Sequence, residues 1–274
     1  MRATMRTILA LTVLLQLARA QDAPPAAPAA PPVLENSGKP MVVPFECTTE
    51  DIQWAGLTCT QDDPCPVYLE LTAAASAGDR FYAAGNIHSS SVTLYSILLG
   101  SDDAGRTWRE THPRIRAAGL DWLQFTDSSS GWAAGQLLFP LPQEPFVLRT
   151  TDGGKTWSEQ IVFNENAENH FGSVQLFHFT SPTAGALVVD RGEGSDTERY
   201  ALFESSNGGE TWSIKEEGGK PLRLKSSPPP AEWRVRADGP TSSFHLERRL
   251  GDRWISRASF AVKLGACKPS EPLR

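Results

Sequence analysis

The sequence predicts an all-β fold, and three observations support this class. The 274-residue chain is rich in glycine (22), proline (21) and tryptophan (8) but has only 3 methionines, a balance that suits turn-rich sheets. Short stretches with strand-like alternation are separated by turn signals, without a sustained helical period. A short turn motif also recurs along the chain. Together these features predict a small β-propeller of four or five four-stranded blades.

The recurring motif has the pattern [ST]-x-[DN]-x-G-x-T-W. Three copies end at Trp108, Trp157 and Trp212, and a worn fourth copy keeps only Gly251 and Trp254. The tryptophans are separated by 49, 55 and 42 residues, which is the length of a four-stranded propeller blade. The motif is therefore expected between the third and fourth strands of each blade.

Each motif position has a structural task. The Asp or Asn side chain can accept hydrogen bonds from the backbone of its own turn, the glycine allows a positive φ, and the tryptophan buries a ring between blades. None of these tasks requires a substrate, so we interpret the motif as structural. Its residues are Ser101, Asp103, Gly105, Thr107, Trp108, Thr150, Asp152, Gly154, Thr156, Trp157, Ser205, Asn207, Gly209, Thr211, Trp212, Gly251 and Trp254.

The predicted propeller spans residues 67–267, and residues 268–274 are expected to form a tail. The first unit runs from Val67 to near Arg109. The later strands are expected at 123–126, 131–138, 146–151 and 156–163 in the second unit, at 174–180, 184–190, 200–205 and 211–215 in the third, and at 233–237, 244–250 and 254–262 in the fourth.

The N-terminal part of the chain is expected to lie outside the propeller. Residues 1–20 have a basic start, a short apolar stretch and a small-x-small site, the layout of a secretory signal peptide. Residues 21–41 are rich in proline and alanine and predict an extended tether. The sequence therefore predicts an exported protein, periplasmic or extracellular, with no transmembrane segment after signal cleavage.

Four cysteines support this location. They are Cys47, Cys59 and Cys65, in an N-terminal segment at 42–66, and Cys267 at the end of the predicted propeller. An even number in an exported chain predicts two disulfides, with three possible connectivities. We expect Cys267 to pair with one of the three early cysteines and so to tie the last unit to the first.

The repeats resemble the Asp-box, or bacterial neuraminidase, repeats of sialidases, sortilin-type receptors and exported bacterial propellers. One stretch is similar to the photosystem II stability and assembly factor superfamily, and this resemblance implies a role in protein binding or assembly. That stretch is Phe125-x-Asp127-x-x-x-Gly131-Trp132, followed by Thr151-Asp152-Gly153-Gly154-Lys155-Thr156-Trp157.

Enzymatic activity is the less favoured hypothesis. A sialidase needs converging arginines and a Tyr nucleophile paired with Glu, and the nearest pair here is Tyr200 with Glu198. Arg114-Ile115-Arg116 follows the first motif and lacks the proline of the sialidase pattern. The five histidines show no metal-binding spacing. We therefore assign no catalytic residue, no metal site and no cofactor, and keep a sialidase-like glycan-binding or glycan-hydrolysing protein as the alternative.

Binding is the favoured function. The net charge of −6 argues against nucleic acid as a partner, so we expect another envelope or exported protein, with a glycan as a further option. The connections between second and third strands should project from one rim, where propellers engage partners. A basic strand offers a second surface for an acidic partner. The candidate binding residues are His88, Phe139, Leu141, Asp190 and Arg191 in the loops, and Arg234 and Arg236 in the strand.

Overall fold

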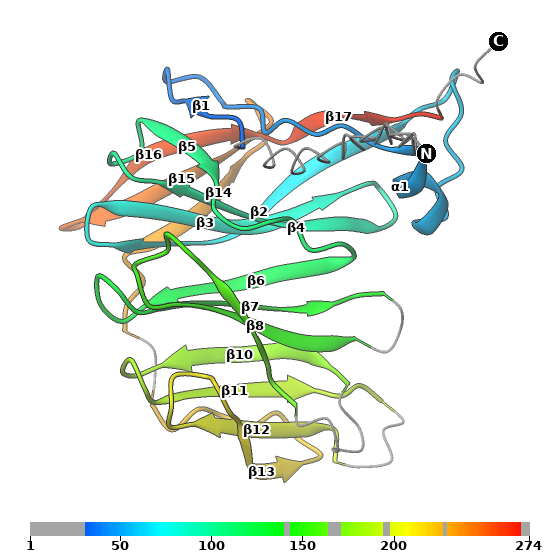
Figure 1. The fold of residues 1–274 in the computed structure, drawn as a ribbon. Coiled ribbons are helices and arrows are strands. Elements are labelled where there is room, and N and C mark those ends of the chain that lie inside the picture. The colour runs from blue at the N-terminus through cyan, green and yellow to red at the C-terminus, as the bar shows by residue number, and fades with distance from the viewer. Residues whose placement is uncertain (1–30, 140–142, 164–170, 194–197, 227–228, 270–274) are drawn as a thin grey trace, which may run out of the picture. The chain divides into compact units, whose positions relative to one another are not determined.

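The computed structural model describes residues 31–139, 143–163, 171–193, 198–226 and 229–269. The predicted signal peptide, residues 21–30 of the predicted tether, and Leu141 lie outside these ranges. The described chain forms four antiparallel sheets, shown in Figure 1, and a short helix α1 (Thr49–Trp54). The predicted all-β class is therefore confirmed, and the four sheets match the blades of a small β-propeller.

The first sheet has the order β1-β5-β4-β3-β2-β17, so six strands replace the expected four. Its central strands follow the predicted hairpin order. Their bounds are β1 (Leu34–Glu35), β2 (Cys65–Ala77), β3 (Arg80–His88), β4 (Thr93–Ser101), β5 (Thr107–Glu110) and β17 (Lys263–Cys267).

The second and third sheets each have the predicted four strands in sequence order. The second comprises β6 (Ala118–Phe125), β7 (Gly131–Leu137), β8 (Glu144–Thr150) and β9 (Ser158–Ile161). The third comprises β10 (Ser173–Phe179), β11 (Gly185–Asp190), β12 (Tyr200–Ser205) and β13 (Ser213–Gly218).

The fourth sheet has three strands, β14 (Trp233–Asp238), β15 (Ser243–Leu250) and β16 (Arg253–Ala261). The chain leaves this sheet at Val262, whose carbonyl oxygen accepts a 2.7 Å hydrogen bond from the backbone N–H of Leu69. It then continues as β17 along β2 of the first sheet. This crossover explains both the three-stranded fourth sheet and the enlarged first sheet.

Part of the segment expected to be a tether belongs to the fold. Leu34 and Glu35 pair with β5, and Met41 forms an isolated parallel bridge with Phe260 of β16. Met41 and Val43 are buried in the core cluster of the first and fourth sheets. The polypeptide is therefore packed against the sheets from Leu34 onward.

The sheets follow one another in the order fourth, first, second, third. β14 and β15 contact β2, then β2, β3 and β4 contact β6, and β10 contacts strands of the second sheet. Apolar side chains fill the space between neighbouring sheets, with the fully buried Trp108 and Phe260 between the fourth and first sheets. No helix in the described ranges has the length and apolarity needed to cross a membrane.

Two disulfides lie where the N-terminal segment meets the last strand. Cys47 is bonded to Cys267, 220 residues away, which confirms that the last cysteine pairs with an early one. Cys59 is bonded to Cys65, and Cys65 lies opposite Cys267 in the register of β2 and β17. Both disulfides therefore lie at one corner of the first sheet.

Candidate binding surface

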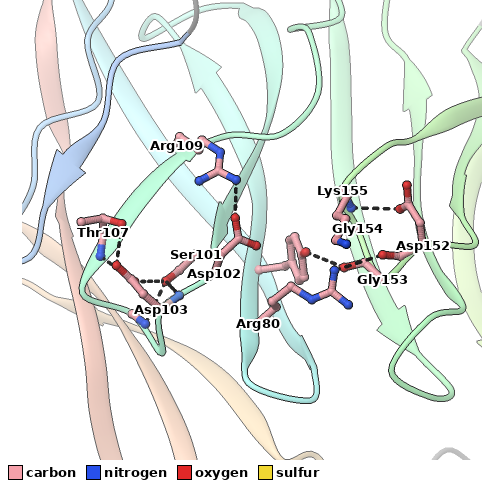
Figure 2. Close-up of polar contacts among 12 residues, drawn as sticks. Arg80, Ser101, Asp102, Asp103, Thr107, Arg109, Asp152, Gly153, Gly154 and Lys155 are labelled. Carbon is pink, nitrogen blue, oxygen red and sulfur yellow. Dashed lines mark hydrogen bonds and ion pairs between the residues drawn. The ribbon is translucent and has the colours of Figure 1, made fainter.

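The Asp-box turns are closed by hydrogen bonds within a few residues (Figure 2). In the first turn, Oδ1 of Asp103 accepts hydrogen bonds from the backbone N–H groups of Arg106 (3.0 Å) and Thr107 (2.9 Å), and Oδ2 accepts from the Thr107 hydroxyl (2.7 Å). Ser101 Oγ accepts from the Gly105 N–H at 2.8 Å. Gly105 has a φ of +91°, a value that favours glycine.

The same network recurs in the second turn, where Asp152 accepts bonds from Lys155 and Thr156. Burial opposes ionisation of Asp103 and Asp152, but the hydrogen bonds from these turns outweigh it and lower the pKa of each carboxyl to about 2. The aspartates are therefore anions held by their own turns.

Each turn also contacts the preceding sheet. Arg80 donates a 3.0 Å hydrogen bond to the carbonyl oxygen of Asp152, and the Tyr82 hydroxyl donates a 2.6 Å bond to the carbonyl oxygen of Gly153. A side chain on Gly154 would meet the Tyr82 ring at 2.4 Å, so the contact requires glycine. The motif thus attaches one sheet to the next.

The loops between second and third strands lie at the other edge of the sheets. Because the Asp-box turns dock near the start of β3 and of β7, the ends of these strands point to the opposite edge (Figure 1). β11 has the same place in the third sheet. His88, Phe139 and Asp190, at or just after the ends of β3, β7 and β11, therefore share this edge, which we call the loop rim.

The polar candidates on the loop rim have partners within the chain. Arg199 contacts both carboxylate oxygens of Asp190 at 2.9 Å, and these hydrogen bonds lower the pKa of Asp190. Arg191 donates a 2.6 Å bond to Glu217. His88 Nδ1 lies 2.7 Å from the carbonyl oxygen of Ser89. These groups hold the loops in place.

Apolar exposure distinguishes the middle of the loop rim. Phe139 is 56% exposed, and Phe171, just before β10, is 41% exposed. A 2.7 Å hydrogen bond from Gly172 N to the Gln143 carbonyl oxygen joins the two loops that carry these rings. Phe171 lies between two repeat units, where no sequence motif marks it.

The basic strand lies apart from the loop rim. Arg234 Nε and Arg236 Nε donate hydrogen bonds of 2.6 and 2.8 Å to the two carboxylate oxygens of Glu247 in β15. The side chain of Glu247 is buried, and Arg234 also stacks over Trp254 at 4.5 Å. The two arginines therefore already have a partner inside the protein.

Chemical groups that a hydrolase would need are also engaged elsewhere. The Tyr95 hydroxyl donates a 2.5 Å hydrogen bond to Asp51, and Tyr82 bonds the second Asp-box turn. The guanidinium carbon of Arg199 lies over the Tyr200 ring, 5.1 Å from the ring centre. Within the described ranges, no group of three or more His, Cys, Asp or Glu side chains is arranged to hold a metal ion.

Comparisons with known proteins find only distant similarity. No known protein family and no curated protein matches the sequence. Among solved structures, YCF48 bound to a D1 peptide is 17% identical, with a TM-score of 0.40 over 70% of this chain and 54% of that chain. A GH74 xyloglucanase from Xanthomonas campestris is 16% identical (TM-score 0.36; 50% and 18%), and an α-L-arabinanase from Penicillium chrysogenum complexed with arabinobiose is 14% identical (0.33; 73% and 62%). The chain spans less than two thirds of the length of each.

Proposed function

We propose that the protein is an exported, non-catalytic binding module whose loop rim contacts another exported or envelope protein. The observation that carries this proposal is the exposed Phe139, which lies beside the loop of Phe171 and between loops whose charges are already paired. A rigid frame around an exposed apolar group is typical of a protein contact. The two disulfides support folding in an oxidising compartment.

Affinity capture tests this proposal. Tagged protein beginning at Gln21 is incubated with the host's envelope extract, and bound proteins are identified by mass spectrometry. We expect a reproducible partner that is lost when Phe139 and Leu141 are both replaced by Ser. The matched control is Ile214→Ser, which removes an exposed apolar side chain from β13 instead. Equal capture by both variants, or recovery of polysaccharide alone, would contradict a protein-binding rim.

The alternative is a sialidase-like glycan-binding or glycan-hydrolysing protein. The observation that favours it is the cluster of Tyr200, Arg199 and Asp190, which places a phenol next to a cation and a carboxylate. A fluorogenic sialoside assay separates the two functions. Turnover that disappears in Tyr200→Phe would support the hydrolase, whereas no turnover together with a captured protein partner would support the binding module.

A further inference from the structure

Neighbouring sheets are attached through the same positions each time. The Oδ1 of Asn86 in β3 accepts a 2.8 Å hydrogen bond from the backbone N–H of Leu120 in β6. Four residues after Trp132, Gln136 in β7 makes the matching contact to the backbone N–H of Val174, at 3.2 Å. These amide side chains reach from the second strand of one sheet to the first strand of the next.

The aromatic contact to the Asp-box turn is also repeated. Tyr82 and Trp132 occupy equivalent places, opposite Gly100 and Arg149 in the strand registers, and each bonds a turn carbonyl of the following sheet. In the third sheet the equivalent residue is Ala186, opposite Glu204. At this place the third sheet has a small side chain where the first two have a large ring.

A third contact between sheets is made by Gln124 and is missing at the equivalent position of the third sheet. The side-chain amide of Gln124 bonds both the N–H (2.9 Å) and the carbonyl oxygen (2.7 Å) of Phe179 in the next sheet. Its equivalent in the third sheet is His178, because Gln124 pairs with Trp132 and His178 with Ala186. His178 is only 7% exposed, yet its imidazole makes no hydrogen bond with any described residue.

A cavity lies on this face of the third sheet. Its volume is about 400 Å³, and its lining includes His178, Ala186, Leu202, Glu204 and Lys225. In the first sheet the place of Ala186 is Tyr82, which bonds the next Asp-box turn. In the second sheet the places of Ala186 and Glu204 are Trp132 and Arg149, and both contact the next turn. The cavity therefore occupies the position at which a further turn would dock.

The fourth sheet has a turn that packs against no other described sheet at its glycine. The worn motif forms the connection between β15 and β16, and Gly251 there has a φ of +60°. A side chain added to Gly251 would meet no atom within 4 Å, whereas one on Gly154 would meet the preceding sheet at 2.4 Å. Leu250 is 61% exposed beside it, and Arg253 is exposed as well.

We propose that the cavity of one chain receives the turn from Leu250 to Arg253 of a second copy, so that two chains associate head to tail. Leu250 suits the apolar floor formed by Ala186 and Leu202. Oε1 of Glu204 accepts a 2.8 Å hydrogen bond from Lys225 of the same chain, and its second carboxylate oxygen would take Arg253, just as Glu247 holds two arginines. Two identical contacts of this kind close a pair, because a heterologous interface forms a ring when its rotation closes. The same docking rule that joins sheets within the chain would then join the two chains.

Sedimentation velocity of the protein beginning at Gln21 tests this association, with urea unfolding of every variant as the folding check. We expect a reversible dimer whose dissociation constant rises by at least about tenfold in Glu204→Arg and in Arg253→Glu, because each places like charges together. Arg253 is exposed, and the ion pair that Glu204→Arg breaks has an exposed lysine, Lys225, so folding should persist in both variants. Ile214→Asp, on the third sheet but outside the cavity lining, should leave the dimer unchanged.

Mixing the two charge-reversed variants gives the decisive result. In a head-to-tail pair, the arginine that replaces Glu204 in one variant meets the glutamate that replaces Arg253 in the other. The second contact of the pair keeps the original Glu204 and Arg253. An equimolar mixture should therefore dimerise at a concentration where each variant alone does not. A monomeric wild-type protein, a dimer insensitive to both substitutions, or a mixture that stays monomeric would each overturn the proposal.

Discussion

The indole Nε1 of Trp132 donates a 2.8 Å hydrogen bond to the carbonyl oxygen of Gly208, so a side chain of the second sheet holds a turn of the third. The Trp132 ring is fully buried and stacks on Phe179, with ring centres 3.7 Å apart and planes inclined by 4°. Tyr82 makes the corresponding bond to Gly153 one sheet earlier. Each of these two Asp-box turns is thus held by a hydrogen bond from the preceding sheet, which stabilises the contact between the sheets.

Trp132→Phe should therefore destabilise the protein. The phenyl ring keeps the stacking on Phe179, but the buried carbonyl oxygen of Gly208 loses its donor, which costs about 1–2 kcal/mol. Urea unfolding measures this loss. The control is Trp212→Phe, because the buried Nε1 of Trp212 has no hydrogen-bond partner among the described residues. This variant removes the same ring atoms without breaking a hydrogen bond, so it should lose less stability than Trp132→Phe. Equal losses in both variants would contradict the role of the Trp132 bond.

The Asp-box aspartates should make stability depend on acid. The folded pKa of Asp103 and Asp152 is about 2, against 3.8 for an ordinary aspartate, so their stabilisation is complete above about pH 4 and disappears as the pH falls through 2. The double variant Asp103→Asn, Asp152→Asn should unfold with a flatter dependence on pH between 4 and 2. The exposed Asp79→Asn serves as the control. A slope identical to that of the wild type in the double variant would contradict this assignment.

The turns and strands could be predicted from sequence because their determinants are local. The bonds of Asp103 reach residues three and four positions away, and the third copy tolerates Asn207 because its amide bonds Thr211 in the reverse direction. The pairing of β17 with β2 joins residues about two hundred positions apart. No local pattern specifies that register, so the six-stranded first sheet and the three-stranded fourth sheet could not be foreseen.

For the candidate site, too, the sequence predicted the local features but not the contacts between distant residues. Loop length and composition identified Phe139 as an exposed apolar residue. The partners of the charged candidates lie elsewhere in the chain, as with Glu217 for Arg191 and Glu247 for Arg234. A list of arginines cannot reveal which carboxylate neutralises each of them, because that depends on strand register. The prediction from sequence therefore included charged side chains that are paired within the protein.

The two disulfides should differ in their effect on stability. The Cys47–Cys267 bond closes a loop of 220 residues and Cys59–Cys65 a loop of 6. On the chain-entropy estimate, replacing the first pair by serine costs about 5 kcal/mol and replacing the second about 2 kcal/mol. Urea unfolding of the two double variants measures the difference. Similar losses would mean that β17 is held by its strand pairing with β2 rather than by the long crosslink.

Substitution of Glu247 distinguishes two roles for the basic strand β14, a structural element or a contact surface. Burial raises the pKa of its carboxyl, but the hydrogen bonds from Arg236 and Arg234 outweigh this effect and lower it. Glu247→Gln removes the charge that holds both guanidinium groups and should cost about 2 kcal/mol, because charged hydrogen bonds to a buried group are lost.

The control for Glu247→Gln is Glu50→Gln, which breaks the exposed ion pair with Arg116 and should cost less than about 1 kcal/mol. Urea unfolding at pH 7 compares the two variants. If Glu247→Gln costs no more than Glu50→Gln, the arginines do not depend on their buried partner. They would then be available to an acidic ligand, and β14 would replace the loop rim as the candidate contact surface.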